Sequence, residues 1–408
     1  MKITTDNTPQ GKVTPLGIIP NEWKILPLQK VGKIYSGGTP DTKEPSYWDG
    51  DILWCTPSDI TKLKTRFITN THQKITQLGL KNSSATLLPP GCILVCTRAT
   101  IGNAAITLKE TSTNQGFKNI KPIKDINVDW LFYCIVSNKH RLVRLGGGST
   151  FLEVSKKDFE KFKIAIPPLP EQQKIAEIIS TWDKAIEKQS QLIEKLELRK
   201  KGLMQQLLTT KRRLPGFSDS WKKVRLGDIA QCFSGGTPKA GRDEYYDGNI
   251  PFIRSGEIHQ KYTELFLSKL GMTESSAKMV QEGDLLMALY GANSGDSAIS
   301  QIEGAINQAI LCIRPRNVLV SFLCPFLNLN KDMYITKYLQ GGQGNLSGEI
   351  VLNYKIPVPP FAEQTAIAQV LTTADHEIEL AKQKLELFRQ QKHGLMQQLL
   401  TGKKRVQL

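Results

Sequence analysis

Two diproline segments of the sequence have the outline of a catalytic loop. Amino-methyltransferases hold their target amine with Asn or Asp, followed by two prolines and an aromatic residue. The chain has IPPL at 166–169 and VPPF at 358–361. The aliphatic side chains of Ile166 and Val358 cannot accept a hydrogen bond from an amine. We expect each diproline to be a stiff entry to the segment that follows it.

Other catalytic signatures are missing from the sequence. It contains no phosphate-binding loop ending in Gly-Lys-Ser/Thr, and its five histidines do not have the spacing of metal ligands. Glu22-Trp23-Lys24 is an isolated match to part of a nuclease motif. We therefore expect no catalytic residues and no metal site, and an enzyme of unrecognised type is the least favoured hypothesis.

The charge of the chain points to a polyanionic partner. The 408 residues include 54 Lys and Arg against 38 Asp and Glu, for a net charge of +16. A surface this basic favours nucleic acid first and a membrane surface second. The sequence has no run of 18 apolar residues that could span a bilayer. Its first twelve residues lack the apolar stretch of a secretory signal. Seven scattered cysteines predict reduced thiols in a cytoplasmic protein, with a zinc site as the alternative.

Most of the chain is a duplication. SGGTP occurs at 36–40 and 234–238, GLMQQLLT occurs at 202–209 and 394–401, and the offset between copies falls from 198 to 192 because the first copy has about six extra residues between 55 and 75. Each copy begins with a segment of short apolar runs separated by Gly and Pro turns, which predicts a mixed globule, or head, dominated by strands.

Each copy ends in a long helix. The segments 171–209 and 363–401 contain no proline, and apolar residues recur at steps of four and three from Ile175 and from Ile367. Such a stripe predicts a coiled-coil seam. Because the order is head, helix, head, helix, we expect the two helices to pack antiparallel as a rigid spacer with a head near each end.

Basic residues interrupt or follow the two helices at equivalent places. Lys200 and Lys392 fall on the same rung of the seam. We expect each lysine to extend its amine out of the seam to water, and a contact that fixes register or partner is the alternative. The clusters at 211–213 and 403–405 are expected to be solvated helix ends, where cations suit the helix dipole, or to contact DNA or a partner subunit.

The combined pattern resembles the specificity (S) subunits of type I restriction-modification systems. The resemblance is carried by Trp23 and Trp221, the two SGGTP turns, TRATIG at 97–102, PPLPEQQKIA at 167–176 and the GLMQQLLT endings, and it covers essentially the whole chain. The second copy departs from it at LYGAN (289–293), where the Thr-Arg pair is missing, and at Phe361-Ala362. We interpret the first departure as a difference in DNA target.

The resemblance implies an α+β chain of two pseudo-symmetric mixed α/β target recognition domains separated by two long helices packed as an antiparallel coiled coil. The expected domains are 1–166 and 214–358, with spacers at 167–213 and 359–408. Each domain would read one half of a bipartite site in double-stranded DNA, and the helices would set the gap. Two methyltransferase (M) subunits and two restriction (R) subunits would dock, with S-adenosylmethionine, ATP and Mg²⁺ bound by those partners and no cofactor in this chain.

Motifs that both heads share cannot explain how the heads read different half-sites. We expect SGGTP to be a structural turn in which glycine allows positive φ, and a contact to a DNA phosphate is the alternative. The Asn-Gln pairs at 114–115 and 307–308 could read adenine or fix a loop. Divergent loops are the better candidates for base contacts, because small polar and basic side chains there can enter a groove.

The residues that we predict to contact DNA lie in these turns and loops. In the first head they are Ser36, Thr39, Ser58, Lys62, Lys64, Arg66, Thr97, Arg98, Thr100, Ser149 and Thr150; in the second they are Ser234, Thr237, Arg254, Ser255, His259, Gln260, Lys261, Tyr262, Tyr290, Asn293, Ser294, Gln343 and Asn345. If Arg98 contacts a guanine, alanine there should cost roughly 1–3 kcal/mol and relax one base position. The competing hypothesis is a coiled-coil adaptor whose two heads bind another protein or an anionic polymer.

Overall fold

The structure is a computed structural model that describes residues 11–147, 152–338 and 345–408. Its contacts divide the chain into two compact units, which we call unit 1 (Met1–Leu192 with Lys382–Leu408) and unit 2 (Ile193–Ala381). Each unit therefore contains one head, the first part of one long helix and the last part of the other. The predicted four-part boundaries differ from this division because they assign each helix to one domain, and they stay a prediction.

Unit 1 is built from small sheets. Its largest sheet has the strand order β4-β11-β8-β9-β6, a second has the order β10-β5-β7, and β1 pairs with β2 and β3 with β12. The strands are β1 (Lys12–Thr14), β2 (Gly17–Ile19), β3 (Lys24–Pro27), β4 (Gly32–Ser36), β5 (Trp48–Cys55), β6 (Phe67–Ile68), β7 (Gln73–Ile75), β8 (Ile93–Cys96), β9 (Ala104–Thr107), β10 (Thr111–Thr113), β11 (Phe117–Pro122) and β12 (Lys163–Ile166). The helices are η1 (Leu28–Lys30), η2 (Pro45–Tyr47), α1 (Pro57–Thr61), α2 (Gln77–Lys81), α3 (Val128–Ser137), α4 (Lys139–Arg144), α5 (Lys156–Lys161) and α6 (Leu169–Leu207).

Unit 2 repeats this plan with four strands in each of its two main sheets, where unit 1 has five and three. Its sheets have the orders β14-β21-β18-β19 and β16-β15-β20-β17, and β13 pairs with β22. The strands are β13 (Lys222–Arg225), β14 (Ala230–Ser234), β15 (Ile250–Ile253), β16 (Leu265–Leu267), β17 (Lys278–Val280), β18 (Leu285–Ala288), β19 (Ser297–Ile299), β20 (Gly304–Ile306), β21 (Ile310–Pro315) and β22 (Lys355–Val358). The helices are α7 (Leu226–Ile229), η3 (Asp243–Tyr245), α8 (Lys269–Thr273), α9 (Val320–Leu329), α10 (Lys331–Tyr338), α11 (Gly348–Leu352) and α12 (Phe361–Leu399).

The six extra residues of the first copy form local structure. They fall in the segment that holds α1 and β6, and β6 adds a parallel strand to the edge of the larger sheet through pairing with β9. The shared strands keep the same register, because Lys118 lies opposite Val95 in unit 1 and Leu311 lies opposite Met287 in unit 2. Residues at equivalent positions of the two units can therefore be compared one by one.

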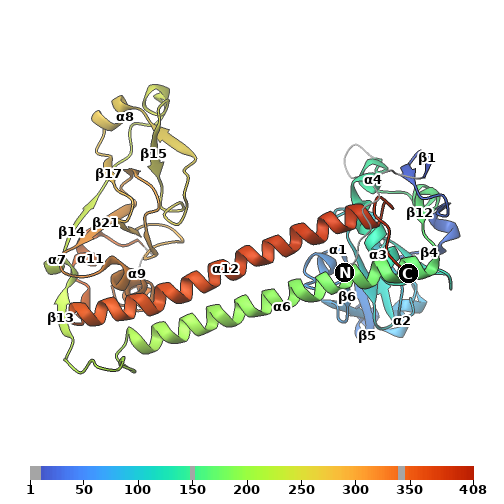
Figure 1. Ribbon diagram of the computed structural model, residues 1–408, viewed down its shortest axis with the longest axis horizontal. Coiled ribbons are helices and arrows are strands. Elements are labelled where there is room, and N and C mark those ends of the chain that lie inside the picture. Colours follow the sequence, from blue (N-terminus) through green and yellow to red (C-terminus); the bar gives the residue numbers. More distant parts are fainter. Residues whose placement is uncertain (1–10, 148–151, 339–344) are drawn as a thin grey trace. The chain divides into compact units, whose positions relative to one another are not determined.

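The predicted helical seam is confirmed. Each rung of the stripes that start at Ile175 and Ile367 is buried or half-buried. In unit 1 the first part of α6 packs with the last part of α12, where the Trp182 and Phe388 rings meet edge to face at 5.7 Å. In unit 2 the last part of α6 packs with the first part of α12 (Figure 1). The two helices are therefore antiparallel.

The expectation that the seam lysines extend to water was wrong. Lys392 Nζ lies 2.5 Å from the carboxylate of Asp183 on the other helix, and Lys200 pairs with Asp375 in the same way. Both lysine side chains are only about a quarter exposed. A cross-helix pair at an otherwise apolar rung favours one register over slipped ones, so the alternative of a register contact accounts for this pair.

The last arginine of each basic cluster after the helices has a different role from the one expected, whereas Lys211, Arg212 and Lys403 are exposed as expected. Arg405 donates to both carboxylate oxygens of Glu171, at 2.7 and 3.0 Å, and Trp23 Nε1 donates to the same carboxylate at 3.0 Å. Because Glu171 is 1% exposed, its charge needs such partners. Arg405 therefore fastens the end of the chain to the first head rather than ending a solvated helix.

Unit 2 contains the same anchor. Arg213 donates to both oxygens of Glu363 at 2.6 and 2.7 Å, and Trp221 Nε1 donates to that carboxylate at 3.0 Å. Glu363 is fully buried. The residues after each long helix thus hold the head of the unit in which that helix ends.

The cysteines behave as core residues. All seven are free thiols, six of them buried, and burial raises the pKa of Cys92 to about 11. Among the described residues no three His, Cys, Asp or Glu side chains gather as metal ligands do. In the same residues, no helix has the length and apolar character needed to cross a bilayer.

Candidate nucleic-acid interface

The SGGTP turns are held by neighbouring loops. Thr39 Oγ1 donates to Gln115, and Thr237 Oγ1 donates to Gln308 at 2.6 Å. Trp54 Nε1 donates to the carbonyl of Gly38 at 3.0 Å. The glycines do not adopt positive φ, which corrects the sequence-based reason for them. They are required because a Cβ at Gly37 would overlap the carbonyl oxygen of Asn114.

The Asn-Gln pairs fix the loops that hold these turns. Asn114 Oδ1 accepts from the backbone N–H of Gly116 at 2.9 Å, and Asn307 Oδ1 accepts from Ala309 at 3.0 Å. The same geometry in both units favours the structural interpretation of the asparagines. Gln115 and Gln308 are exposed, but their side-chain oxygens already accept hydrogen bonds from the threonines of the SGGTP turns.

Three of the predicted segments converge in unit 1. Thr97 N–H donates to the carbonyl of Gly116 at 2.8 Å, and a Cβ on Gly116 would lie within 4 Å of Pro57 and Arg98. The start of α1, the turn after β8 and the Asn-Gln loop therefore meet at one place. The turn after β8 contains Ala99 at φ 56°, a left-handed conformation that costs about 1–2 kcal/mol for a residue with a Cβ and is common at functional sites.

Residues 153 and 154 join this cluster. Val154 N–H donates to the carbonyl of Thr97 at 3.0 Å, and Glu153 exchanges backbone hydrogen bonds of 3.1 and 3.2 Å with Gly147. Unit 2 repeats the arrangement, because Leu346 N–H donates to Leu289 at 2.8 Å. Glu153 in unit 1 and Asn345 in unit 2 are thus equivalent residues at the same surface.

A cluster of three charges marks this surface in unit 1. Arg98 Nη2 lies 2.6 Å from one carboxylate oxygen of Glu153, and Lys118 Nζ lies 3.8 Å from the other. Burial lowers the pKa of Lys118, and the nearby Glu153 carboxylate opposes that change. The equivalent positions in unit 2 hold Tyr290, Leu311 and Asn345, so the shared backbone carries different chemistry in the two units.

Some predicted DNA contacts turn inward. Thr97 is 1% exposed and donates to Gly116, and Ser294 is 4% exposed and donates to the carbonyl of Leu289. Thr100 Oγ1 is buried. Thr97 directly follows β8, and Ser294 lies in the turn between β18 and β19, so the local backbone directs these hydroxyls away from the surface.

Two predicted arginines are engaged with carboxylates. Arg66 is 14% exposed, pairs with Asp129 at 2.8 Å and Asp183 at 3.5 Å, and stacks on Phe67. Arg254 donates to Glu257 and Glu264, which raises its pKa further above the usual range. Arg66 therefore joins the head to α6 rather than facing a ligand, and Arg254 has only part of its surface available.

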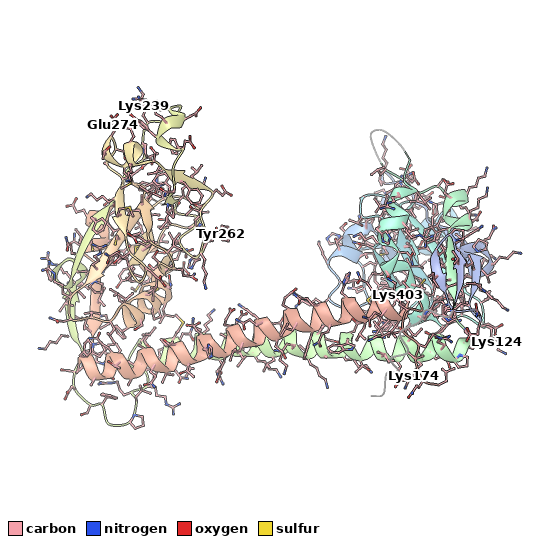
Figure 2. All side chains as sticks on the ribbon, turned by 45° about the horizontal axis from the view of Figure 1, so that its top comes forward. Lys124, Lys174, Lys239, Tyr262, Glu274 and Lys403 are labelled. Atoms are coloured by element: carbon pink, nitrogen blue, oxygen red, sulfur yellow. The ribbon has the colours of Figure 1, made fainter. Side chains whose placement is uncertain are left out.

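The other predicted residues lie at or near the surface. Tyr262 is 68% exposed in the loop between β15 and β16 (Figure 2). The exposed residues of the set are Ser58, Lys62, Lys64, Arg98, Thr237, His259, Lys261, Tyr262, Tyr290, Asn293 and Asn345, and the half-buried ones are Ser36, Thr39, Ser234, Ser255 and Gln260. Ser149, Thr150 and Gln343 lie outside the described residues.

Sequence reasoning missed Glu153 and Lys118. Neither lies in a segment that looks like a polar loop, because Lys118 is inside β11 and Glu153 follows a leucine. A signal was present, since Lys118 and Asn119 of the first copy (FKNI, 117–120) correspond to Leu311 and Cys312 of the second (ILCI, 310–313). Comparing the copies strand by strand would have found it.

Comparison with known proteins settles the class of this chain. A model of the family described as type I restriction modification DNA specificity domain matches residues 20–198 and again residues 218–388. The chain belongs to that family. It is therefore a specificity subunit of a type I restriction-modification system, a class of recognition subunit that is not itself catalytic. The two matched segments cover most of both copies of the repeat.

Curated relatives agree with this placement. The chain is 29% identical over 306 residues to the type I restriction enzyme MjaIX specificity subunit of Methanocaldococcus jannaschii, covering 71% of each protein. It is 32% identical over 170 residues to the EcoR124I/EcoR124II specificity subunit of Escherichia coli, covering 40% of this chain and 41% of that one.

Solved structures share the fold of this specificity subunit. A chain from a study of complex assembly and conformational transition of the type I R-M system has a TM-score of 0.64 at 19% identity, covering 94% of this chain and 99% of that chain. The S subunit from M. genitalium has a TM-score of 0.58 at 15% identity, covering 95% and 98%. These likenesses confirm two mixed α/β domains with long helices.

Proposed function

We propose that each unit of this specificity subunit reads one half of a bipartite site in double-stranded DNA, while α6 and α12 set the gap between the halves. The observation that carries the proposal is the pair of surfaces built on one backbone plan. Arg98 and Glu153 in unit 1 and Tyr290 and Asn345 in unit 2 occupy equivalent places but offer different hydrogen-bonding groups. Two readers of unlike half-sites need this combination of a shared frame and distinct contacts.

The partners follow from the same proposal. The net charge of +16 supplies phosphate affinity without sequence information. Two methyltransferase subunits would dock on the helices and two restriction subunits would join them, in the cytoplasm. Those partners would bind S-adenosylmethionine, ATP and Mg²⁺, and this chain would bind none of them.

The test is to lengthen the helices. Inserting four residues into each of α6 and α12 adds about 6 Å to each helix, which corresponds to roughly two base pairs of DNA. Modified adenines would be mapped across the genome in cells that carry the wild-type or the lengthened chain. The proposal requires a bipartite motif whose halves stay the same while the gap widens by one or two base pairs.

Two outcomes would contradict this proposal. A genome in which removal of the chain changes no modified position would show that the chain does not direct methylation, and would favour the adaptor hypothesis. A gap that stays unchanged after insertion would show that the helices do not set the spacing. A matched control inserts four residues in the exposed hairpin between β1 and β2, where no change in the gap is expected.

A further inference from the structure

We propose that Glu153 in unit 1 and Asn345 in unit 2 are matched base-reading residues, each of which determines the base at one position of its half-site. The inference rests on the function proposed above and names the side chains that carry it out. Glu153 would accept a hydrogen bond from the exocyclic amine of cytosine, and Asn345 would bind the edge of adenine. These pairings suit the hydrogen-bonding capacity of the two side chains in the major groove.

The backbone places the two residues at the same point. Each lies one residue before a backbone hydrogen bond to the turn that follows the central strand, from Val154 to Thr97 in unit 1 and from Leu346 to Leu289 in unit 2. Asn345 Oδ1 also lies 3.4 Å from the backbone nitrogen of Gly291 in that turn. A substitution at this place changes the exposed chemistry without changing the frame around it.

The Glu153 carboxylate is held in a fixed position. Its backbone is hydrogen-bonded to Gly147 in both directions, and its two oxygens face Arg98 at 2.6 Å and Lys118 at 3.8 Å. The Glu153 side chain nevertheless remains 33% exposed and that of Arg98 45% exposed. A carboxylate fixed by two cations can approach the polyanion DNA because its charge is already balanced, and a fixed group loses little entropy on binding.

The fold does not require the lysine that holds this carboxylate. Lys118 is 6% exposed inside β11, whereas unit 2 has Leu311 at the same register and buries it to 3%. Replacing a buried ion pair with an apolar residue is often neutral or stabilising. Unit 1 therefore keeps a costly buried cation where its own duplicate uses leucine. Holding Glu153 for a ligand gives a reason for that cost.

The test exchanges hydrogen-bonding capacity while keeping shape. In host cells with the native partner subunits, Glu153→Gln should change the preferred base at one position of one half-site, with on the order of a tenfold loss of preference for cytosine. The other half-site and the gap should stay as in the wild type. Asn345→Asp should alter the other half-site alone. Glu110→Gln, an exposed glutamate in the loop between β9 and β10, is the control and should leave the motif unchanged.

A second variant separates specificity from folding. Lys118→Leu introduces the residue that unit 2 already tolerates, so the protein should fold and still modify DNA, but with a relaxed base at the same position as Glu153→Gln. The inference is overturned if Glu153→Gln leaves the motif unchanged, or if it weakens modification equally for every sequence. Absence of any bipartite motif in the wild type would instead overturn the proposed function.

Discussion

The long helices are supported differently in the two units, although the rung that joins them is the same. In unit 1, Asp183 binds the seam lysine Lys392 and also accepts from Tyr133 Oη at 2.5 Å, and Arg66 bridges it to Asp129. The head is thereby tied to the helix pair by a polar network, and Trp182 fills the seam beside it.

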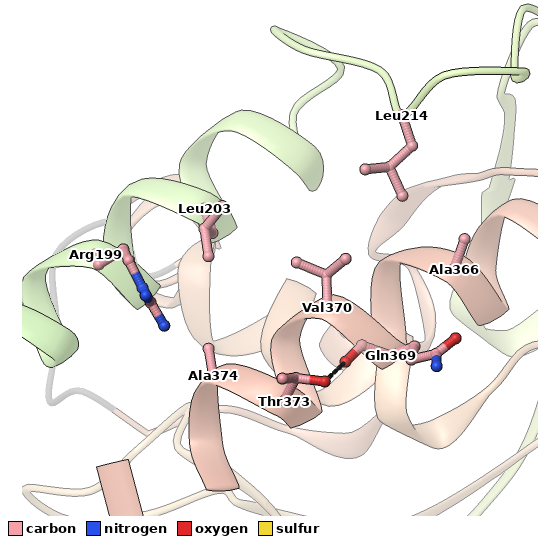
Figure 3. Close-up of a pocket in the computed structure, with 8 residues that line it drawn as sticks. All are labelled: Arg199, Leu203, Leu214, Ala366, Gln369, Val370, Thr373 and Ala374. Atoms are coloured by element: carbon pink, nitrogen blue, oxygen red, sulfur yellow. Dashed lines mark hydrogen bonds between the residues drawn. The ribbon is translucent and has the colours of Figure 1, made fainter. Parts of the chain in front are cut away.

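Unit 2 keeps the lysine–aspartate pair between the helices but has different residues where Tyr133 and Asp129 support that pair in unit 1. The counterparts of Tyr133 and Asp129 are Pro325 and Ser321, and they line a cavity of about 160 Å³ beside Lys200 and Asp375. Ala374 stands where unit 1 has Trp182, and it lines a groove of about 500 Å³ with Leu203, Val370 and Arg199 (Figure 3). Duplication has thus preserved the contacts that fix register, while the packing between helix and head has diverged.

The largest expected effect concerns the anchor that the units share. Arg405→Ala would leave the buried Glu171 carboxylate without its cation, so we expect a loss of about 3 kcal/mol of unfolding free energy in unit 1. Arg213→Ala should cost a similar amount in unit 2. Hydrogen exchange followed separately in each unit measures both. A loss below about 1 kcal/mol in either unit would show that water replaces the arginine and that the anchor is not structural.

Much of this architecture was predictable from the sequence, and the reason is local periodicity. The seam from Ile175 onward repeats every three or four residues, so a short window shows it. The partners of Glu171 gave no such signal, since Arg405 lies 234 residues away and a lone glutamate at a helix start is usually solvated. Only the joint repetition of Trp, Glu and Arg in both copies could have indicated the anchor.

The candidate interface was predicted in part for a related reason. Several of the segments that differ between the copies lie close together in the structure, and their contacts to DNA stay a prediction. The local backbone path decides whether a polar side chain points inward, and it buries Thr97, directly after β8, and Ser294, in the turn between β18 and β19. Arg66 is held by ion pairs with Asp129 and Asp183, which lie far from it in the sequence. Such pairings depend on tertiary geometry, which spacing along the chain does not encode.

The second prediction breaks the packing that distinguishes unit 1. Trp182→Ala removes the ring that meets Phe388, and because Trp182 is half-buried we expect a loss of about 2–3 kcal/mol, below the 3–5 kcal/mol of a fully buried tryptophan. Hydrogen exchange in α6 and α12 within unit 1 would report it, with Leu387→Ala, a 56% exposed position of α12 in the same unit, as the control. Equal losses for both variants would mean that the ring does not stabilise the seam.

The third prediction uses an ion pair that only unit 2 has. Burial would raise the pKa of Asp284, but hydrogen bonds from Arg314 at 2.7 and 2.9 Å outweigh burial and hold that pKa below its usual range. The folded pKa is lowered, so this stabilisation is present above the unfolded value near 4 and is lost as pH falls through the folded pKa. Unit 1 has Cys92 and Lys121 at these positions.

Acid titration would test this difference between the units. Asp284→Asn should destabilise unit 2 by about 1 kcal/mol at neutral pH and should reduce the decline of its stability below pH 4, with unit 1 unaffected. Asp243→Asn, at an exposed position of the same unit, is the matched control. The interpretation fails if wild type and Asp284→Asn lose stability in parallel as the pH is lowered.

The smallest expected effect would make unit 2 resemble unit 1. Ala374→Leu adds apolar volume at the groove that Ala374 lines, and filling a space of this kind commonly stabilises by about 0.5–1 kcal/mol. His376→Leu, two residues along α12 at an exposed position, adds a leucine without filling the groove and should give no gain. If Ala374→Leu lowers the stability of unit 2, the groove is closed in solution and the two units are packed more alike than their sequences indicate. If it raises stability but abolishes methylation, the open groove serves partner binding, and the divergence between the units reflects function at that surface.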